Sequence, residues 1–369
     1  MSVVILLWIV TFLTIRWLVA SKNHSFLYWD SAWYVSIAQS GYRFDGNVMH
    51  QQNVAFLPAL PLVERLMFAL KIPLPLAVDV PCITSAISGI LLLYRAIAAR
   101  FAPLWSATGC ALIVASPFSL YFLNGYSESL YLLCFGAFFW ALWSRQNPAL
   151  AALFAGLASA VRPYGLLLTA IWAASLVIEG RREGKTPKEI AGRLLLYGPL
   201  CVSGFVVTSL FFYYEFGDLF LYRNIMVAWV VDTLHGSPGD IGDHFIAVGR
   251  VLTTIDLAHL LVSTEFARLL FWSTVFVIPL VARRLPLAAT LYGSLLVMFI
   301  VVNSETGADL GRHLSTNLAL PLGLLALIWS PQSVFARSSQ WALLVVVWVA
   351  TMSMQAVFIS RYFQAQWVS

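Results

Sequence analysis

The sequence predicts an all-α polytopic membrane protein, and three observations support this class. Of its 369 residues, 60% are hydrophobic and only 11% are charged, whereas soluble domains contain about 45–50% apolar and about 25% charged residues. The mean hydropathy is +0.82. Apolar runs recur along the whole chain, bounded by charged residues, proline or glycine. A soluble enzyme, a disordered chain and a secreted disulfide scaffold are therefore excluded.

About 11 of the apolar runs are long enough to be transmembrane helices, since a span needs about 20 residues. They lie at about 4–20, 76–98, 103–122, 126–143, 147–161, 164–179, 193–214, 266–282, 286–303, 314–329 and 340–359. The first run resembles a signal peptide in length. No Lys or Arg precedes it, so we interpret it as an uncleaved first span.

The basic residues predict the orientation of the spans. With the N-terminus inside, short inner connections contain Arg and Lys, as the positive-inside rule requires. These residues are Arg95, Arg100, Arg145, Arg181, Arg182, Lys185, Lys188, Arg193, Arg283, Arg284 and Arg337. All six histidines and most acidic residues then fall on the outer side.

Two predicted outer segments, at about 21–75 and about 215–264, are too long to be simple turns. Both contain aromatic residues at helical spacing, so we expect two long outer loops bearing short helices on the membrane surface. No internal repeat is recognisable, and residues 1–369 are predicted to form a single membrane domain. The four cysteines lie in apolar runs without a CxxC pair, which indicates neither a disulfide framework nor a zinc site.

The densest polar and aromatic cluster, WDSAWYVSIAQSGY at residues 29–42, directly follows the first span. Its acid, Asp30, lies between Trp29 and Trp33 at the predicted outer boundary. One interpretation is an interfacial aromatic belt with a solvated carboxylate. The other is a carboxylate in a partly desolvated site, where it can act as a general base.

Four further motifs follow along the chain. They are AFLPALPLVERL at 55–66, NGYSESLYLL at 124–133, ASAVRPYGLLL at 158–168 and GRHLSTNLALPL at 311–322. Together with the cluster at 29–42 they resemble, in order, the motifs of the PIG-V family. This family comprises GPI mannosyltransferases and their prokaryotic relatives, within the multi-span GT-C glycosyltransferases. The resemblance implies a GT-C-like helical body and a mannose donor carried on a polyprenyl phosphate.

The resemblance also implies that Asp30 is the catalytic base of an inverting hexosyltransferase. A sugar on a lipid monophosphate already has a good leaving group, so the reaction needs one base and cations for the phosphate. No resident metal or other cofactor is expected. We assign Arg312, His313 and Arg162 to the donor phosphate, because a planar guanidinium binds phosphate with two hydrogen bonds. The alternative for each arginine is a side chain that reaches the lipid headgroups.

Sugar or acceptor binding is assigned to Trp29, Trp33, Tyr34, Gln52 and Glu128. Glu128 would alternatively pair with one of the arginines, and Gln52 would alternatively belong to a plain polar loop. Acids and histidines of the second outer loop resemble metal ligands by residue type: Asp232, His235, Asp240, Asp243 and His244. Their spacing matches no known metal site, and we expect a solvated loop.

The motifs depart from the family at several positions. Leu57 and Leu60 replace aromatic residues of the second motif. An Arg-Pro-Tyr-Gly turn stands in the fourth motif where the family has Arg-Ser-Asn-Gly, and Arg312-His313 stands in the last motif where it has Arg-Tyr. The expected acceptor is therefore a prokaryotic glycolipid, glycan or protein rather than a GPI precursor. The expected partners are this acceptor, the polyprenyl-phosphate-linked sugar and membrane lipids, without nucleic acid.

The expected location is the cell membrane of a prokaryote, with the active site on the outer face, or the endoplasmic reticulum membrane in a eukaryote. A multi-span lipid or sugar transporter is the main alternative function. It would predict internal repeats and broken spans at the membrane midplane, whereas the polar residues here lie at the outer boundary. A membrane acyltransferase would require a histidine-centred site, and no histidine lies deep in a span.

Overall fold

The computed structural model describes residues 2–20, 27, 29–234, 263–303, 307–328 and 337–363. These residues form helices and connecting turns and contain no strand, as the all-α class predicts. The chain divides into two compact units. Unit 1 comprises Met1–Phe26, Ile97–Tyr121 and Val251–Ser369, and unit 2 comprises Leu27–Ala96 and Phe122–Arg250.

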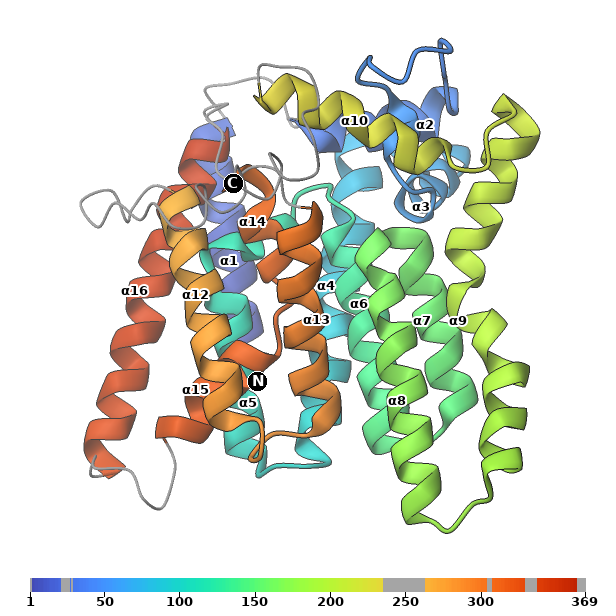
Figure 1. The fold of residues 1–369 in the computed structure, drawn as a ribbon. Helices are drawn as coiled ribbons and strands as arrows, with labels where there is room; N and C mark the ends of the chain where they lie inside the picture. The colour runs from blue at the N-terminus through green and yellow to red at the C-terminus, as the bar shows by residue number, and fades with distance from the viewer. Residues whose placement is uncertain are drawn as a thin grey trace. The chain divides into compact units, whose positions relative to one another are not determined.

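Unit 2 contains the first predicted outer loop and the spans that follow it. Its long helices are α4 (Leu74–Ala98), α6 (Glu128–Phe139), α7 (Pro148–Val161), α8 (Leu166–Arg182) and α9 (Pro187–Phe216). Its shorter elements are α2 (Asp30–Ser40), α3 (Ala59–Ala69), α10 (Leu221–Leu234) and the single turns η1 (Asn53–Ala55), η3 (Trp140–Ser144) and η4 (Pro163–Gly165). Figure 1 shows α2, α3 and α10 grouped at one end of α6, α7 and α9. Short helices in both outer loops are thus confirmed.

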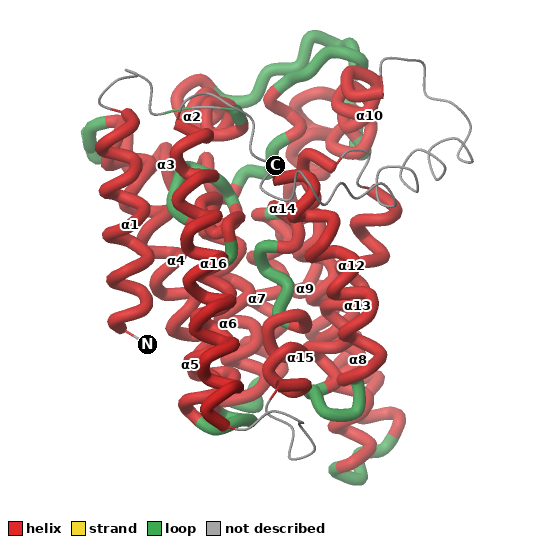
Figure 2. Tube along the Cα trace, turned by 90° about the vertical axis from the view of Figure 1, so that its left-hand side faces the viewer, coloured by secondary structure: helices red, strands yellow, loops and turns green. Residues whose placement is uncertain are grey.

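Unit 1 is assembled from distant parts of the chain. It contains α1 (Ser2–Ala20), α5 (Pro103–Ala115), most of η2 (Pro117–Phe122), α12 (Ser263–Val281), α13 (Leu287–Asn303), α14 (Gly307–Leu314), α15 (Ala319–Ile328) and α16 (Arg337–Phe363). The helix α1 packs against α5 and α16, which Figure 2 shows running alongside each other. The buried Ser119 hydroxyl accepts hydrogen bonds from Trp8 at 3.1 Å and Gln355 at 2.5 Å. One serine therefore ties the first and last helices of the unit together.

Each predicted span contains a helix of the structure, but their number as membrane crossings is not confirmed. Among the described residues, three segments are long and apolar enough to cross a membrane: Leu74–Ala98, Pro163–Arg182 and Pro187–Phe216. Within the predicted span at 314–329, residues 319–328 form the helix α15, which begins later than expected. A buried turn separates α14 from α15 there, because Asn317 donates to Thr274 at 2.7 Å and accepts from the backbone of Ala319 at 3.2 Å. These bonds stabilise the non-helical turn.

Small residues allow close helix packing in unit 2. A Cβ added to Gly156 of α7 would lie 2.1 Å from the Leu200 carbonyl oxygen, and one added to Gly204 of α9 would lie 2.3 Å from the Gly156 carbonyl oxygen. The Ser159 hydroxyl also accepts a 3.0 Å hydrogen bond from the Phe205 backbone. Such contacts are typical of membrane helices, where packing rather than the hydrophobic effect holds helices together.

One of the buried acids of unit 2 is Glu64. Glu64 lies on the inner face of α3 with a side chain that is 0% exposed, and neither of its carboxyl oxygens makes a hydrogen bond among the described residues. Burial raises the pKa of Glu64 from 4.5 to about 8. The carboxyl is therefore protonated in the folded protein at neutral pH.

We expect Gly204→Ala to lower the thermal stability. The added methyl group has no space against α7, and overpacking of this kind costs about 1–3 kcal/mol. Gly192→Ala is a matched control on the same helix, because a Cβ at Gly192 meets nothing within 4 Å. Thermal unfolding of both variants in one detergent compares them. Equal melting temperatures would contradict the close approach of α7 and α9.

We also expect Glu64→Gln to change how stability depends on pH. The folded pKa of about 8 lies above the ordinary value of 4.5, so the folded state binds a proton that the unfolded state has released. Stability should therefore fall as pH rises from about 5 to 8. The Gln variant should show a smaller fall, measured by thermal unfolding across this range. Glu215→Gln, at an exposed position of α9, should follow the wild type; the same behaviour in Glu64→Gln would exclude Glu64 as the cause.

Candidate functional site

Asp30 is the first residue of α2 and is half-buried. The residue before it, Trp29, has φ 56° and ψ −130°, a conformation that bulky residues rarely adopt. Such backbone strain costs about 1–3 kcal/mol and persists only where the surrounding structure enforces it. The strained turn fixes the direction in which the chain enters α2. Asp30 thus lies at a constrained helix start, where the helix dipole favours its negative charge.

The start of α2 packs against the turn that precedes α6. Gly125 in this turn has a φ of +70°, and a Cβ added to it would lie 2.8 Å from Val78 Cγ1 and 3.1 Å from Ser31 Cβ. Both the backbone conformation and the lack of space require glycine here. The turn therefore contacts the residue that follows Asp30.

A buried polar network continues from this turn. The Tyr34 hydroxyl lies 2.7 Å from Ser127 Oγ, and Arg162 donates to the same oxygen at 3.3 Å. Arg162 Nη2 also lies 3.1 Å from Glu128 Oε1, with side-chain exposures of 11% and 0%. The pairing of Glu128 with an arginine, one of the two predicted alternatives, is confirmed. The pair lets each charge be buried in unit 2.

Arg162 lies in the predicted turn between two helices. It follows α7 and precedes η4, with extended backbone angles of φ −145° and ψ 144°. Its guanidinium carbon lies 5.3 Å from the centre of the Tyr164 ring. Burial raises the pKa of Tyr222 on α10 to about 12, and the positive charge of Arg162 opposes this rise. Arg162 therefore lies within electrostatic range of α10, in the second predicted outer loop.

Aromatic side chains pack beside α2. The rings of Trp33 and Phe56 stack at 5.9 Å, and Tyr34 meets Phe56 edge-on at 5.1 Å. Leu60 belongs to the same buried cluster. This leucine, one of the two that depart from the family's second motif, therefore packs in the core of unit 2. Tyr34 is 1% exposed, whereas Trp29 is 40% exposed. Of the three predicted sugar-binding aromatics, Tyr34 lies inside unit 2 and Trp29 at its surface.

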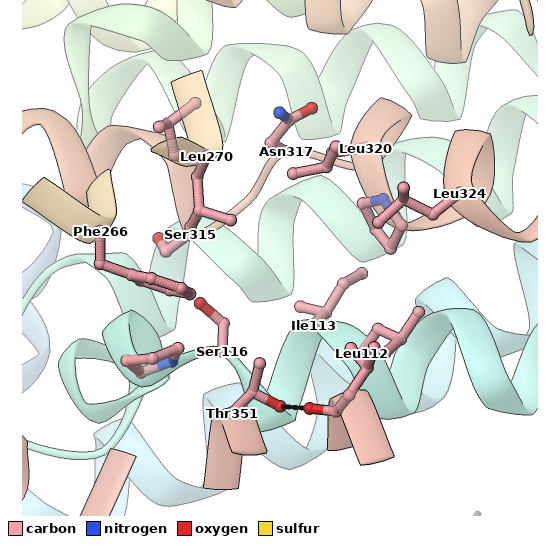
Figure 3. Close-up of a pocket in the computed structure, with 14 residues that line it drawn as sticks. Leu112, Ile113, Ser116, Phe266, Leu270, Ser315, Asn317, Leu320, Leu324 and Thr351 are labelled. Atoms are coloured by element: carbon pink, nitrogen blue, oxygen red, sulfur yellow. Dashed lines mark hydrogen bonds between the residues drawn. The ribbon is translucent and has the colours of Figure 1, made fainter. Parts of the chain in front are cut away.

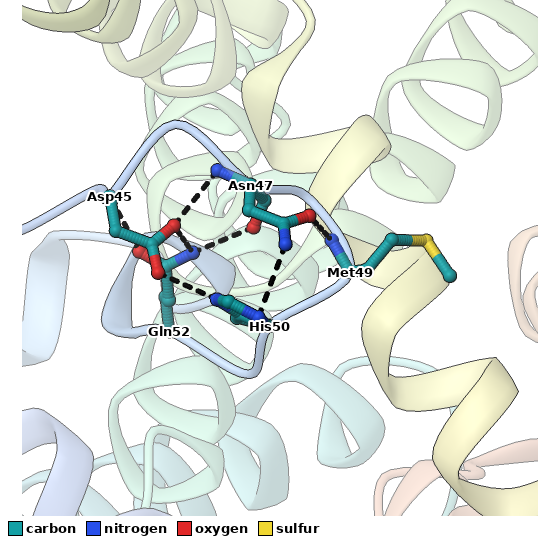
Figure 4. Close-up of polar contacts among 5 residues, drawn as sticks. All are labelled: Asp45, Asn47, Met49, His50 and Gln52. Carbon is teal, nitrogen blue, oxygen red and sulfur yellow. Dashed lines mark hydrogen bonds and ion pairs between the residues drawn. The ribbon is translucent and has the colours of Figure 1, made fainter.

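Figure 4 shows the polar contacts that shape the loop between α2 and η1. Asp45 pairs with His50 at 2.7 Å, and this hydrogen bond holds the pKa of Asp45 below its usual range. The Gln52 amide donates to Asp45 and to the Asn47 carbonyl, each at 2.8 Å, and accepts from the Asp45 backbone at 2.7 Å. The amide nitrogen and oxygen of Gln52 thus both make hydrogen bonds within the loop and stabilise its conformation.

Arg312 lies in unit 1, at the end of α14. It is 3% exposed, and its guanidinium carbon lies 5.4 Å from the centre of the Tyr121 ring. The adjacent Gly311 packs directly on Phe118, whose ring carbon lies 2.1 Å from the position of an added Cβ. His313 is half-buried and meets Phe299 edge-on at 5.8 Å. Close packing thus fixes the position of Arg312.

An apolar cavity of about 110 Å³ adjoins the end of α14 within unit 1. Figure 3 shows Ser315 and Asn317, from the turn after Arg312, among the side chains that line it. Phe266 and Leu270 of α12, Leu112 of α5 and Leu324 of α15 supply apolar walls. This cavity was not predicted, because its walls come from separate helices, α5, α12, α14, α15 and α16, and carry no local motif.

Within the residues that the structure describes, no group of three His, Cys, Asp or Glu side chains is placed to hold a metal ion. Of the acids and histidines that resemble metal ligands in the second outer loop, all but Asp232 lie at 235–262, outside the described residues.

Comparison with known proteins gives a match of fold only. The sequence matches no protein family and no curated protein. The structure resembles the Archaeoglobus fulgidus oligosaccharyltransferase in complex with Zn and sulfate, with a TM-score of 0.51, 12% identity and coverage of 98% of this chain and 53% of that one. The apo form of the same enzyme gives a TM-score of 0.50, 12% identity and coverage of 98% and 56%. The chain therefore spans about half the length of these structures, and over that part it shares their fold.

Proposed function

We propose that this chain is an inverting glycosyltransferase that moves mannose from a polyprenyl phosphate to a glycolipid, glycan or protein acceptor. The observation that carries the proposal is the placement of Asp30 at a strained, half-buried helix start. Strain of this kind is concentrated at functional sites. The fold shared with an oligosaccharyltransferase supports the same reaction class.

The proposed reaction is a direct displacement at the anomeric carbon. Asp30 takes the proton of the acceptor hydroxyl as its oxygen bonds to the anomeric carbon. The bond from that carbon to the phosphate oxygen breaks, and its electron pair stays on the lipid phosphate. Cationic side chains stabilise the charge that develops on the phosphate. We propose that no resident metal takes part.

The two candidate phosphate ligands differ in their surroundings. Arg162 already pairs with Glu128, which neutralises much of its charge. Arg312 lies over the Tyr121 ring, two residues before the cavity-lining Leu314. We assign the donor phosphate to Arg312, with His313 beside it, because their motif at 311–322 continues into the lining of the apolar cavity, and we assign the first isoprene units of the lipid to that cavity. Arg162 then acts mainly by holding Glu128 and Ser127.

The acceptor and the sugar are assigned to the surface of unit 2. Trp29 is exposed and Trp33 is half-buried, so their rings can pack against a sugar face. Gln52 contributes by shaping its loop rather than through a free amide. We propose that this side faces outward from the membrane, as the distribution of Arg and Lys predicts.

Asp30→Asn should lower turnover by about 10²–10⁴-fold, because it removes the base while keeping the size and polarity of the side chain. Donor binding should survive. Purified full-length protein is assayed with polyprenyl-phosphate mannose and a panel of glycolipid acceptors, with Glu215→Gln as the control. Wild-type turnover in the Asn variant would exclude Asp30 as the base. Movement of the lipid-linked sugar across a vesicle membrane without glycosidic cleavage would instead favour the transporter.

Arg312→Ala should lower turnover per folded molecule by about 10–100-fold, since a charge-assisted contact contributes about 1.5–3 kcal/mol. Arg312→Lys keeps the charge but loses the planar fork, so it should retain part of the activity. Arg283→Ala, at an exposed position of unit 1, is the matched control. Normal turnover in a folded Arg312→Ala protein would show that Arg312 has only a structural role.

A further inference from the structure

Ser127 occupies the N-cap position of α6 but does not cap the helix. Serine is favoured at this position because its oxygen accepts a hydrogen bond from a free backbone N–H of the first turn. Here the Ser127 side chain makes no such bond, and its backbone angles are helical, with φ −66° and ψ −14°. The fully buried hydroxyl is therefore directed elsewhere.

The hydroxyl bridges two parts of unit 2. It lies 2.7 Å from the Tyr34 hydroxyl of α2 and accepts from Arg162 at 3.3 Å. A serine hydroxyl has one donor and two acceptor sites, so it can make both bonds at once. A missing N-cap bond lowers the stability of a protein by about 1 kcal/mol. The bonds of Ser127 to Tyr34 and Arg162 must offset this loss. The Ser127 hydroxyl therefore joins α2 to Arg162 instead of capping α6.

The bridge acts on the helix that begins at Asp30. Tyr34 is four residues after Asp30, on the same side of α2. The adjacent turn residue Gly125 packs against Ser31, so the turn at 125–127 contacts α2 at two successive helical turns. Residue 128, next in the chain, pairs with Arg162. A shift of Ser127 would move α2 relative to the Arg162–Glu128 pair.

We propose that Ser127 is a positioning residue that holds the Asp30-bearing helix in register with the Arg162–Glu128 pair. The proposal rests on the proposed function, because it gives Ser127 a role in orienting the base. Small misplacements of a catalytic group lower the rate without weakening substrate binding. Ser127 should therefore influence turnover and leave the KM for the donor unchanged.

The test compares variants of the full-length protein. Ser127→Ala and Tyr34→Phe should each lower kcat about 10-fold with unchanged donor KM. The double variant should lose no more than Ser127→Ala alone, because that substitution already removes the bond to Tyr34 together with the bond to Arg162. Ser129→Ala is the matched control. Ser129, in the first turn of α6, is equally buried, and its hydroxyl donates to the Tyr126 carbonyl at 2.9 Å and interacts with Cys82 of α4. These contacts involve neither α2 nor Arg162, so the kcat of Ser129→Ala should stay near wild type.

A second readout does not depend on activity. Thermal unfolding of the same four proteins should show that the losses of Ser127→Ala and Tyr34→Phe are not additive. Additive losses, or an equal kcat loss in Ser129→Ala, would overturn the proposal. If the wild-type protein transfers no sugar, the proposed function fails together with the catalytic role of Ser127. An active wild-type protein with an unaffected Ser127→Ala variant would overturn the role of Ser127 alone.

Discussion

The buried ion pair between Arg162 and Glu128 is the constraint on which the geometry around Asp30 depends. Neither charge can leave its partner without large cost, because an unpaired buried charge destabilises a protein by about 3–5 kcal/mol. Glu128 begins α6, and Arg162 ends α7, so the pair fixes how these helix ends approach one another. The turn at 125–127 is covalently joined to Glu128 and contacts α2. Asp30 is thereby positioned through a chain of contacts that starts at two opposite charges.

Close helix packing supplies the frame in which that pair is held. Gly156 and Gly204 bring α7 and α9 together at the distance of backbone contact, and Arg162 follows from the end of α7. Phe212 of α9, with Leu221 and Ile225 of α10, buries Val54 of the first loop. The aromatic and polar residues of this loop are thus held by apolar contacts with a long helix. The positions of the polar residues at one end of unit 2 therefore depend on the glycines that let α7 and α9 pack closely.

Periodicity and boundary residues predicted the class of fold and most helices, because a long apolar run forms a helix in almost any membrane setting. They missed the break between α14 and α15, where Asn317 hydrogen-bonds to a residue distant in sequence. Asp30 was proposed because it stands between two tryptophans at the start of a series of motifs, and its role as a base stays a prediction. The pairing of Glu128 with an arginine was one of two predicted alternatives. Ser127 was missed because a serine before a helix normally indicates a cap. Only the folded chain reveals that its hydroxyl is used elsewhere.

The serine that joins Trp8 and Gln355 has a consequence for biosynthesis. About 300 residues separate α1 from α16, so α1 leaves the ribosome long before the helix that completes its packing. Unit 2 is contained between residues 27 and 250, and its contacts can form while unit 1 is still partial. Because domains generally fold as units during synthesis, α1 must wait for α16 before its packing around Ser119 is complete. A truncation that removes α16 would therefore damage the packing of α1, a helix made about 300 residues earlier.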